Sequence, residues 1–331
     1  MKVCILAEGG RDIGLGHLYR CRSIAIELRE QTKVDIFASC PEENLLRSVF
    51  EGLSYRFLKP EEIYNGASFD AVIVDIPGFS YESQQTLRKK CKLLIGIDDS
   101  GEGPFDYDVL IRPNFLQMSA PRMTRAGAQI LAGRDCIILH PAFSKLTPST
   151  ERSDKAKELL ICFGGSDPGG LTLRVIPVLR QLPAGISIDI IVGRGFSRPE
   201  RVVDLIGGDN RFSVLLNVPD LAEMLNTCSA ALIAGGTLMY EACALGVPSV
   251  VICQNEEQNR EAAVFAEQHA VLNLGSAKSV CDSIIIDAVG KVCCDTELRK
   301  ELSGNAKKMV SRTGVQRVAT MILDKLAQMT G

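Results

Sequence analysis

The chain lacks an excess of charge of either sign. Its 331 residues carry 37 Lys and Arg against 40 Asp and Glu, a formal net charge of -3. Because nucleic acid and anionic membranes attract concentrated positive charge, neither is an expected partner. No apolar run is long enough to span a bilayer, and the apolar run at 3–7 meets Glu8 too soon for a signal peptide. We expect a cytoplasmic protein with no integral membrane segment.

Metal and redox motifs are also lacking. The twelve cysteines include no Cys-x-x-Cys pair, and most of them, such as Cys4, Cys162 and Cys253, lie in apolar strand or helix patterns. Cysteine used as a small hydrophobic side chain is typical of a reducing compartment. We therefore predict no bound metal and no disulfide framework.

Two cofactor motifs are incomplete. No glycine loop is followed by the lysine of a P-loop, which argues against a P-loop kinase. The loop Gly-Leu-Gly-His at 14–17 begins like a dinucleotide fingerprint, but Tyr19 stands where its third glycine belongs. The second expected strand ends at Ser39 without the acid that would hold an adenosine ribose. A nicotinamide enzyme is therefore disfavoured, and we predict no cofactor.

What the chain does have is a repeated alternation of short apolar segments and helical patterns, which is typical of βαβ units and parallel sheets. The expected strands are 2–7, 34–39, 70–75, 93–97, 109–112, 137–139, 158–163, 186–192, 212–216, 230–234, 249–253 and 270–274. A polar, Pro-containing stretch at 146–157 is the candidate linker. The sequence thus predicts an α/β chain of two Rossmann-like, doubly wound domains, 1–147 and 155–331, with a ligand cleft between them. The tail from Glu297 is expected to be an amphipathic surface helix.

One stretch organises the second half. The strand expected at 230–234 runs into Gly-Gly-Thr at 235–237, and Thr237 is expected to cap a helix over 238–245. Such a turn offers free backbone N–H groups and the positive end of a helix dipole, which suit phosphate. Glu241, one turn further on, could accept hydrogen bonds from the hydroxyls of a ribose. Alternatively, the turn connects the strand to the helix without binding a ligand, and Glu241 is a solvated acid that the helix dipole stabilises.

Two further loops follow expected strands. Gly-Gly-Ser-Asp at 164–167 could touch a diphosphate or simply turn the chain. His17 opens a helix, whose positive end opposes imidazolium, so a neutral ring could serve as a general base or be structural. Asp12 in the same loop could orient His17 or meet substrate hydroxyls. Asp75 and Asp98 end two other strands, where ligands of such sheets bind.

Together these motifs resemble a known family. The residues that carry the resemblance are Gly14-x-Gly16-His17, Asp98-Asp99, Phe163-Gly164-Gly165-Ser166-Asp167-Pro168 and Gly235-Gly236-Thr237-x-x-x-Glu241-Ala242-x-x-x-Gly246-Val247-Pro248. They look like the PseG family, the UDP-sugar hydrolases of pseudaminic acid synthesis. The second half is also similar to MurG, the UDP-N-acetylglucosamine transferase of peptidoglycan synthesis. The resemblance spans nearly the whole chain and implies the two-domain GT-B fold.

The resemblance implies a UDP-sugar substrate, held mainly by the second domain. Glu241 would bind the uridine ribose, and the backbone of Val218 would meet uracil. His17 would activate the water that attacks the anomeric carbon with inversion. With the residues singled out by their place in the loops, the candidate catalytic residues are His17, Asp12 and Glu257. The candidate substrate-binding residues are Gly14, Gly16, Arg20, Asp75, Asp98, Gly164, Gly165, Ser166, Asp167, Val218, Gly235, Gly236, Thr237, Glu241 and Gln258.

Two positions depart from the family on its sugar side. Pro77 stands where the family carries tyrosine, and Glu257-Gln258 stands where it carries Asn-Gln. A carboxylate at Glu257 could change the sugar or act as an acid or base. Three functions stay open: a hydrolase of a UDP-linked amino or deoxy sugar in nonulosonic acid or surface-polysaccharide synthesis, an inverting glycosyltransferase, and a UDP-sugar sensor. The sequence leaves the oligomeric state open.

Overall fold

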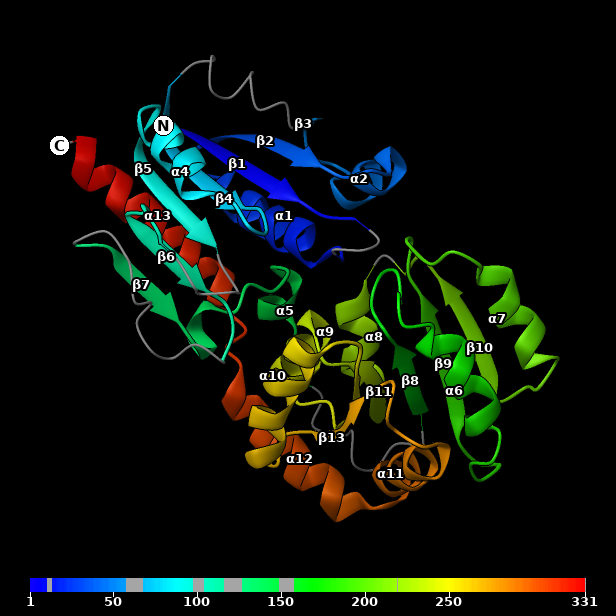
Figure 1. The fold of residues 1–331 in the computed structure, drawn as a ribbon. Helices are drawn as coiled ribbons and strands as arrows, with labels where there is room; N and C mark the ends of the chain where they lie inside the picture. The colour runs from blue at the N-terminus through cyan, green and yellow to red at the C-terminus, as the bar shows by residue number, and fades with distance from the viewer. Residues whose placement is uncertain are drawn as a thin grey trace. The chain divides into compact units, whose positions relative to one another are not determined.

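The computed structural model describes residues 1–10, 14–57, 68–97, 104–115, 127–148, 158–218 and 220–330. The chain forms two compact units, of which unit 1 comprises 1–141 and 313–331 and unit 2 comprises 142–312. The element labels below are those of Figure 1. Among the described helices, none is both long and apolar enough to cross a bilayer.

Unit 1 is built on a seven-stranded parallel sheet. Its strands are β1 (Lys2–Glu8), β2 (Lys33–Ser39), β3 (Tyr55–Phe57), β4 (Phe69–Asp75), β5 (Cys91–Ile97), β6 (Val109–Arg112) and β7 (Gln129–Ala132), in the order β3-β2-β1-β4-β5-β6-β7. The sheet therefore grows in opposite directions from the neighbouring strands β1 and β4. Doubly wound sheets bind ligands at the carboxyl ends of such a strand pair.

Helices cover both faces of this sheet because β1 alternates its side chains between two buried clusters. Val3 and Ile5 pack with α1 (Gly16–Leu28) and α13 (Gly314–Thr330), whereas Cys4 and Leu6 pack with Leu87 of α4 (Tyr81–Arg88). In Figure 1, α13 (red) lies beside α1 (blue). Among its described residues, unit 1 also contains α2 (Glu43–Val49) and the 3-10 turn η1 (Arg134–Cys136).

Unit 2 repeats the plan with a six-stranded parallel sheet in the order β10-β9-β8-β11-β12-β13. The strands are β8 (Glu158–Cys162), β9 (Ser187–Val192), β10 (Phe212–Leu216), β11 (Ala230–Ala234), β12 (Ser249–Cys253) and β13 (Leu272–Ser276). The helices are α5 (Ala142–Lys145), α6 (Leu171–Leu179), α7 (Pro199–Ile206), α8 (Leu221–Thr227), α9 (Thr237–Leu245), α10 (Glu256–Glu267), α11 (Asp282–Cys294) and α12 (Thr296–Met309). Here the strand order reverses between β8 and β11.

The structure differs from the sequence expectations in three places. Residues 137–139 form no strand, although Ile137 and Leu139 are buried, and the last strand of the first sheet is β7 instead. The structure adds the short edge strand β3 and the helix α11, which were not expected. The tail from Glu297 is divided into α12 and α13, and α13 is not a surface appendage of the second domain. It buries Val318 and Ile322 in the core of unit 1, because its apolar stripe faces the stripe of α1.

Candidate functional site

His17 and Asp75 meet where the strand order of unit 1 reverses. His17 is the second residue of α1, which follows β1, and Asp75 is the last residue of β4. Since β1 and β4 are neighbours with Ala7 opposite Asp75, the carboxylate comes within hydrogen-bonding distance of the ring. The Nδ1 atom of His17 lies 2.8 Å from Asp75 Oδ1. Asp75 is 1% exposed, so the pair is shielded on the carboxylate side.

Arg20, one turn along α1 from His17, neutralises the buried carboxylate. Its Nε donates to Asp75 Oδ2 over 2.5 Å and its Nη2 donates to Asp75 Oδ1 over 2.6 Å. Burial acts to raise the pKa of Asp75, but the charge and hydrogen bonds of Arg20 and the hydrogen bond of His17 outweigh it and lower the pKa to about 2. Asp75 is therefore an anion at neutral pH. Asp75 and Arg20 were both expected to touch substrate; they form an ion pair beside His17, and their contact with substrate stays a prediction.

The carboxylate orients the imidazole. An ionised Asp75 can only accept hydrogen bonds, so it favours the His17 tautomer with its proton on Nδ1. Arg20 Nη2, which can only donate, also lies 2.9 Å from Nδ1. In the tautomer with the proton on Nδ1, this contact brings two donors together, and both donate to Asp75 Oδ1, over 2.8 and 2.6 Å, rather than to each other. None of the described residues bonds to Nε2 of His17, whose side chain is 20% exposed. Nε2 then carries a lone pair that can take a proton from a bound molecule.

The glycine loop before α1 is held by backbone bonds. Gly10 and Gly14 exchange two hydrogen bonds of 3.1 and 2.8 Å, and Gly14 has a φ of +92°, which favours glycine. Gly16 is the first residue of α1. Asp12 and Asp98 lie outside the described residues.

In unit 2, the turn between β11 and α9 brings backbone atoms close to other groups. A Cβ at Gly235 would lie 2.8 Å from Cys253 Sγ, and one at Gly236 would lie 3.3 Å from Gln258 Nε2. The helix N-cap is Gly236, whose lack of a side chain leaves the first amides of α9 open to a ligand. Thr237 was expected to be this cap, but it is the exposed first residue of the helix.

Glu241 is a partly buried carboxyl one turn into α9. Burial raises its pKa from 4.5 to about 8, and no described cation or hydrogen-bond donor offsets that effect. A ligand that donates hydrogen bonds to this carboxyl would stabilise its ionised form. The vicinal hydroxyls of a ribose are such a ligand, as the sequence pattern suggested.

The glycine turn after β8 is shaped by Asp167. Gly164 has a φ of +90° and Asp167 a φ of +44°. The Asp167 carboxylate is buried and accepts hydrogen bonds from the N–H groups of Leu171 (3.0 Å) and Thr172 (2.7 Å), at the start of α6. These bonds hold the turn in shape, and the expected contact of Asp167 with substrate stays a prediction. Gly165 and Ser166 remain partly exposed in the turn.

Two glutamines tie this turn to the end of β12. Gln254 Nε2 donates to the carbonyl of Phe163 over 2.9 Å, and Gln258 Oε1 accepts from the Gln254 N–H over 2.9 Å. Gln254 carried no sequence signal, and its role was missed because the contact spans 91 residues. Glu257 is exposed on the first turn of α10, and Val218 is partly exposed just beyond β10. Across the described ranges, no three His, Cys, Asp or Glu side chains gather as metal ligands would.

Comparisons with known proteins agree with this architecture. No protein-family model matches the chain. The chain is 25% identical over 339 residues to the spore coat polysaccharide biosynthesis protein SpsG of Bacillus subtilis, with 99% of each chain covered. It is 21% identical over 276 residues to the UDP-2,4-diacetamido-2,4,6-trideoxy-beta-L-altropyranose hydrolase of Campylobacter jejuni, with 81% of this chain and 97% of that protein covered.

Among solved structures, MurG of Acinetobacter baumannii is similar, with a TM-score of 0.70 at 16% identity over 98% of this chain and 99% of that one. This likeness and the two parallel sheets show the α/β, GT-B type fold of two Rossmann-like units, and the fold expected from the sequence is confirmed. The resemblance to PseG and MurG is supported at low identity by the hydrolase and by MurG itself.

Proposed function

We propose that this protein hydrolyses a UDP-linked amino or deoxy sugar at its anomeric carbon, as a step in making a surface polysaccharide or a nonulosonic acid. The observation that carries the proposal is the buried Asp75 on Nδ1 of His17, which leaves Nε2 as a base. The names of two relatives support the substrate class, since one is a UDP-sugar hydrolase and the other serves spore coat polysaccharide synthesis. The open amides of α9 and the donor-seeking Glu241 support the nucleotide part.

In the proposed reaction, His17 Nε2 takes a proton from a water molecule as the water oxygen bonds to the anomeric carbon. The bond from that carbon to the β-phosphate oxygen breaks, and its electron pair leaves with UDP. Attack from the opposite side inverts the configuration. Asp75 stabilises the imidazolium that forms, because its carboxylate already accepts from Nδ1. Backbone amides at the start of α9 stabilise the negative charge on the departing diphosphate.

We propose that UDP binds along the turns of unit 2. Glu241 accepts the ribose hydroxyls, the Val218 backbone meets uracil, and the diphosphate binds at 164–166 and 235–237. Gln258 and the exposed Glu257 contribute to sugar recognition from the first turn of α10. Asp167 supports this site through the fold of its turn.

The test is to incubate the protein with candidate UDP-sugars and no acceptor, and to measure UDP release. We expect turnover that His17→Gln lowers by a factor of about 10² to 10⁴, with UDP affinity retained, since the ring acts on water rather than on UDP. His269→Gln is the matched control, because His269 is an exposed histidine of unit 2.

Each other outcome points elsewhere. UDP release only when an acceptor hydroxyl is added favours an inverting glycosyltransferase, in which His17 or Glu257 deprotonates that acceptor. UDP-sugar binding without turnover favours a sensor. Full turnover in His17→Gln excludes His17 as the base.

A further inference from the structure

One side chain of unit 2 joins elements on both sides of β11. Gln254 directly follows β12, and in the sheet β11 lies between β12 and β8. The Gln254 side chain nevertheless bonds to the turn after β8. This contact therefore spans the carboxyl end of β11, from which the turn at 235–237 begins. Gln254 thus lies between the two turns that are proposed to hold the diphosphate.

The side-chain amide of Gln254 contacts both residues that flank 164–166. Its Nε2 donates to the carbonyl of Phe163 over 2.9 Å and, more weakly, to Asp167 Oδ1 over 3.4 Å. Phe163 is buried and comes just after the last residue of β8, and a buried backbone carbonyl requires a hydrogen-bond donor. Gln254 supplies such a donor, so a single amide group bonds to the start and to the end of the turn.

Backbone atoms hold the same turn from the other side. In the sheet, β9 lies on the side of β8 away from β11. In the loop after β9, the Gly195 N–H donates to the Gly165 carbonyl over 2.9 Å, and a Cβ at Gly193 would lie 2.5 Å from that oxygen. This loop rests on Gly165 through main-chain contacts, whereas the connection to β12 depends on the side chain of Gln254.

The backbone of Gln254 orients a second amide group. Its N–H donates to Gln258 Oε1 over 2.9 Å, and because an N–H can only donate, this bond fixes which end of the Gln258 amide is the oxygen. Gln258 Nε2 lies 3.3 Å from the position that a Cβ on Gly236 would take. The N–H donors of Gln258 are therefore beside the N-cap of α9.

We propose that Gln254 is a positioning residue, which holds the turns at 164–166 and 235–237 in the arrangement that one diphosphate requires. The inference rests on the proposed function, because it concerns how the same site is built. A turn that is bonded at both ends to one amide has fewer conformations in the free protein. It therefore loses less conformational entropy when a phosphate binds to it. Gln254 acts through the turns rather than by touching UDP.

The test separates affinity for the phosphates from affinity for the nucleoside. We would measure the Kd of UDP and of uridine by calorimetry for the wild type and for Gln254→Met, Gln254→Ala and Gln254→Glu. All three variants keep the backbone N–H that bonds to Gln258, so only the side-chain contact is lost.

The expected losses follow from the missing donor. Met and Ala should bind UDP about 3- to 10-fold more weakly, which is the range of one neutral hydrogen bond, and uridine should bind as before. Glu is closer to glutamine in shape than Met is, but an ionised carboxylate cannot donate to the Phe163 carbonyl. Gln254→Glu should therefore bind UDP no more tightly than Gln254→Met.

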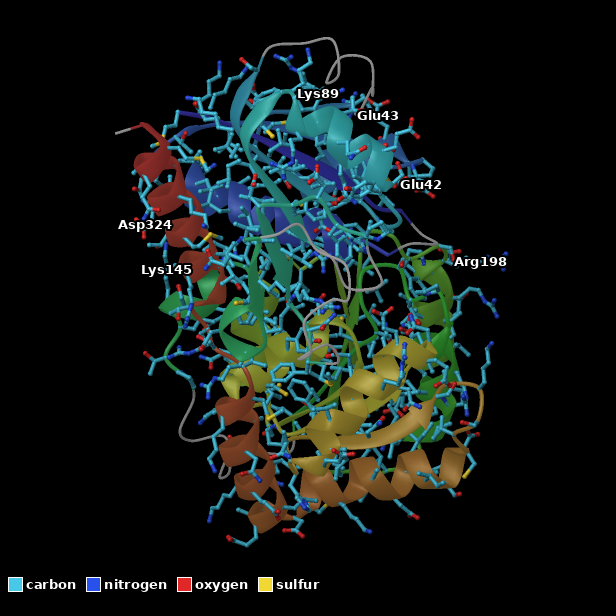
Figure 2. All side chains as sticks on the ribbon, turned by 60° about the vertical axis from the view of Figure 1, so that its left-hand side comes forward. Glu42, Glu43, Lys89, Lys145, Arg198 and Asp324 are labelled. Atoms are coloured by element: carbon cyan, nitrogen blue, oxygen red, sulfur yellow. The ribbon has the colours of Figure 1, made fainter. Side chains whose placement is uncertain are left out.

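Gln268→Met and Gln268→Glu are the matched controls, because Gln268 is an exposed glutamine at the C-cap of α10. Arg198→Met is a second control for polar side chains beyond the strands of this sheet. Arg198 follows β9 at the N-cap of α7, and Figure 2 shows it at the surface. All three controls should bind UDP as the wild type does.

The outcomes distinguish this inference from the proposed function. Wild-type UDP affinity in Gln254→Met or in Gln254→Glu overturns the role of Gln254 and leaves the hydrolase proposal standing, because the donor would then not matter. An equal loss of UDP and uridine affinity also overturns it, since the effect would then lie in unit 2 as a whole rather than in the phosphate turns. A wild-type protein that binds no uridine nucleotide removes the proposed function itself.

Discussion

Replacing Glu241 by glutamine tests the unusual state of this carboxyl. Its pKa in the folded protein is raised by burial from 4.5 to about 8. An acid with a raised folded pKa contributes stability that is complete below pH 4.5 and is lost as the pH rises through 8. The wild type should therefore lose stability between these pH values, whereas the glutamine variant, which cannot ionise, should not.

The magnitude follows from the same values. At 1.36 kcal/mol per pH unit, a change from 4.5 to about 8 amounts to about 5 kcal/mol as an upper limit. Because Glu241 keeps partial contact with water, we expect about 2 kcal/mol. Glu241→Gln should thus match the wild type near pH 4 and exceed its free energy of unfolding by about 2 kcal/mol at pH 8.5.

The assay is urea unfolding at pH 4.5, 6, 7 and 8.5, read by circular dichroism. Glu223→Gln is the matched control, because Glu223 is an exposed acid in the first turn of α8. A stability difference between Glu241→Gln and the wild type that stays constant from pH 4.5 to 8.5 would refute the reasoning.

Proton release on UDP binding is a second test of the raised pKa of Glu241. Ribose hydroxyls that donate to an ionised Glu241 would lower its pKa, so UDP binding near pH 7 should release protons. Calorimetry in two buffers of different ionisation enthalpy measures that release. The release should be absent in Glu241→Gln, and a wild type that binds UDP without releasing protons would contradict the assignment of the ribose to Glu241.

Two further predictions concern unit 1. Asp75→Asn should lower the free energy of unfolding by about 3 kcal/mol at pH 7, because it leaves the partly buried Arg20 without its carboxylate, and adding Arg20→Gln should recover part of the loss in urea unfolding. The Asp75 contribution is complete above pH 3.8 and is lost as the pH falls through about 2, so the variant and the wild type should converge in strong acid. Gly314→Ala should loosen α13, because a Cβ there would overlap the carbonyl oxygen of Ile137, and proteolysis should then cleave the tail first, whereas Gly304→Ala, where a Cβ meets open space, should not.

The fold was predicted from short-range features of the sequence. The strands at 109–112, 212–216, 230–234 and 249–253 have the predicted bounds. Three of them are buried parallel strands, which read as continuous apolar runs between turn residues, and the edge strand at 212–216 is a short apolar run as well. The glycine turns after β8 and β11 were also visible, since a strand that ends in Gly-Gly before a helix is a local pattern. The strand at 137–139 was wrong, because a buried apolar triplet does not by itself reveal whether a neighbouring strand will pair with it.

The candidate site depends on contacts that local sequence patterns do not predict. His17 and Asp75 were both singled out as ends of local elements, but their contact spans 58 residues and exists because β4, rather than β2 alone, lies beside β1. Arg20 and Asp167 were taken as substrate contacts, and only the folded chain shows that they bond to Asp75 and to the start of α6.

By itself, then, the sequence determined the alternation of strands and helices, the two parallel sheets and the glycine turns, since these depend on residues within a few positions of one another. The tertiary structure decided the order of the strands, the partner of the imidazole, the loop that rests on Gly165 and the unit to which α13 belongs. Those features depend on packing between segments that are far apart in the chain, and hydrophobic periodicity does not specify which buried face meets which.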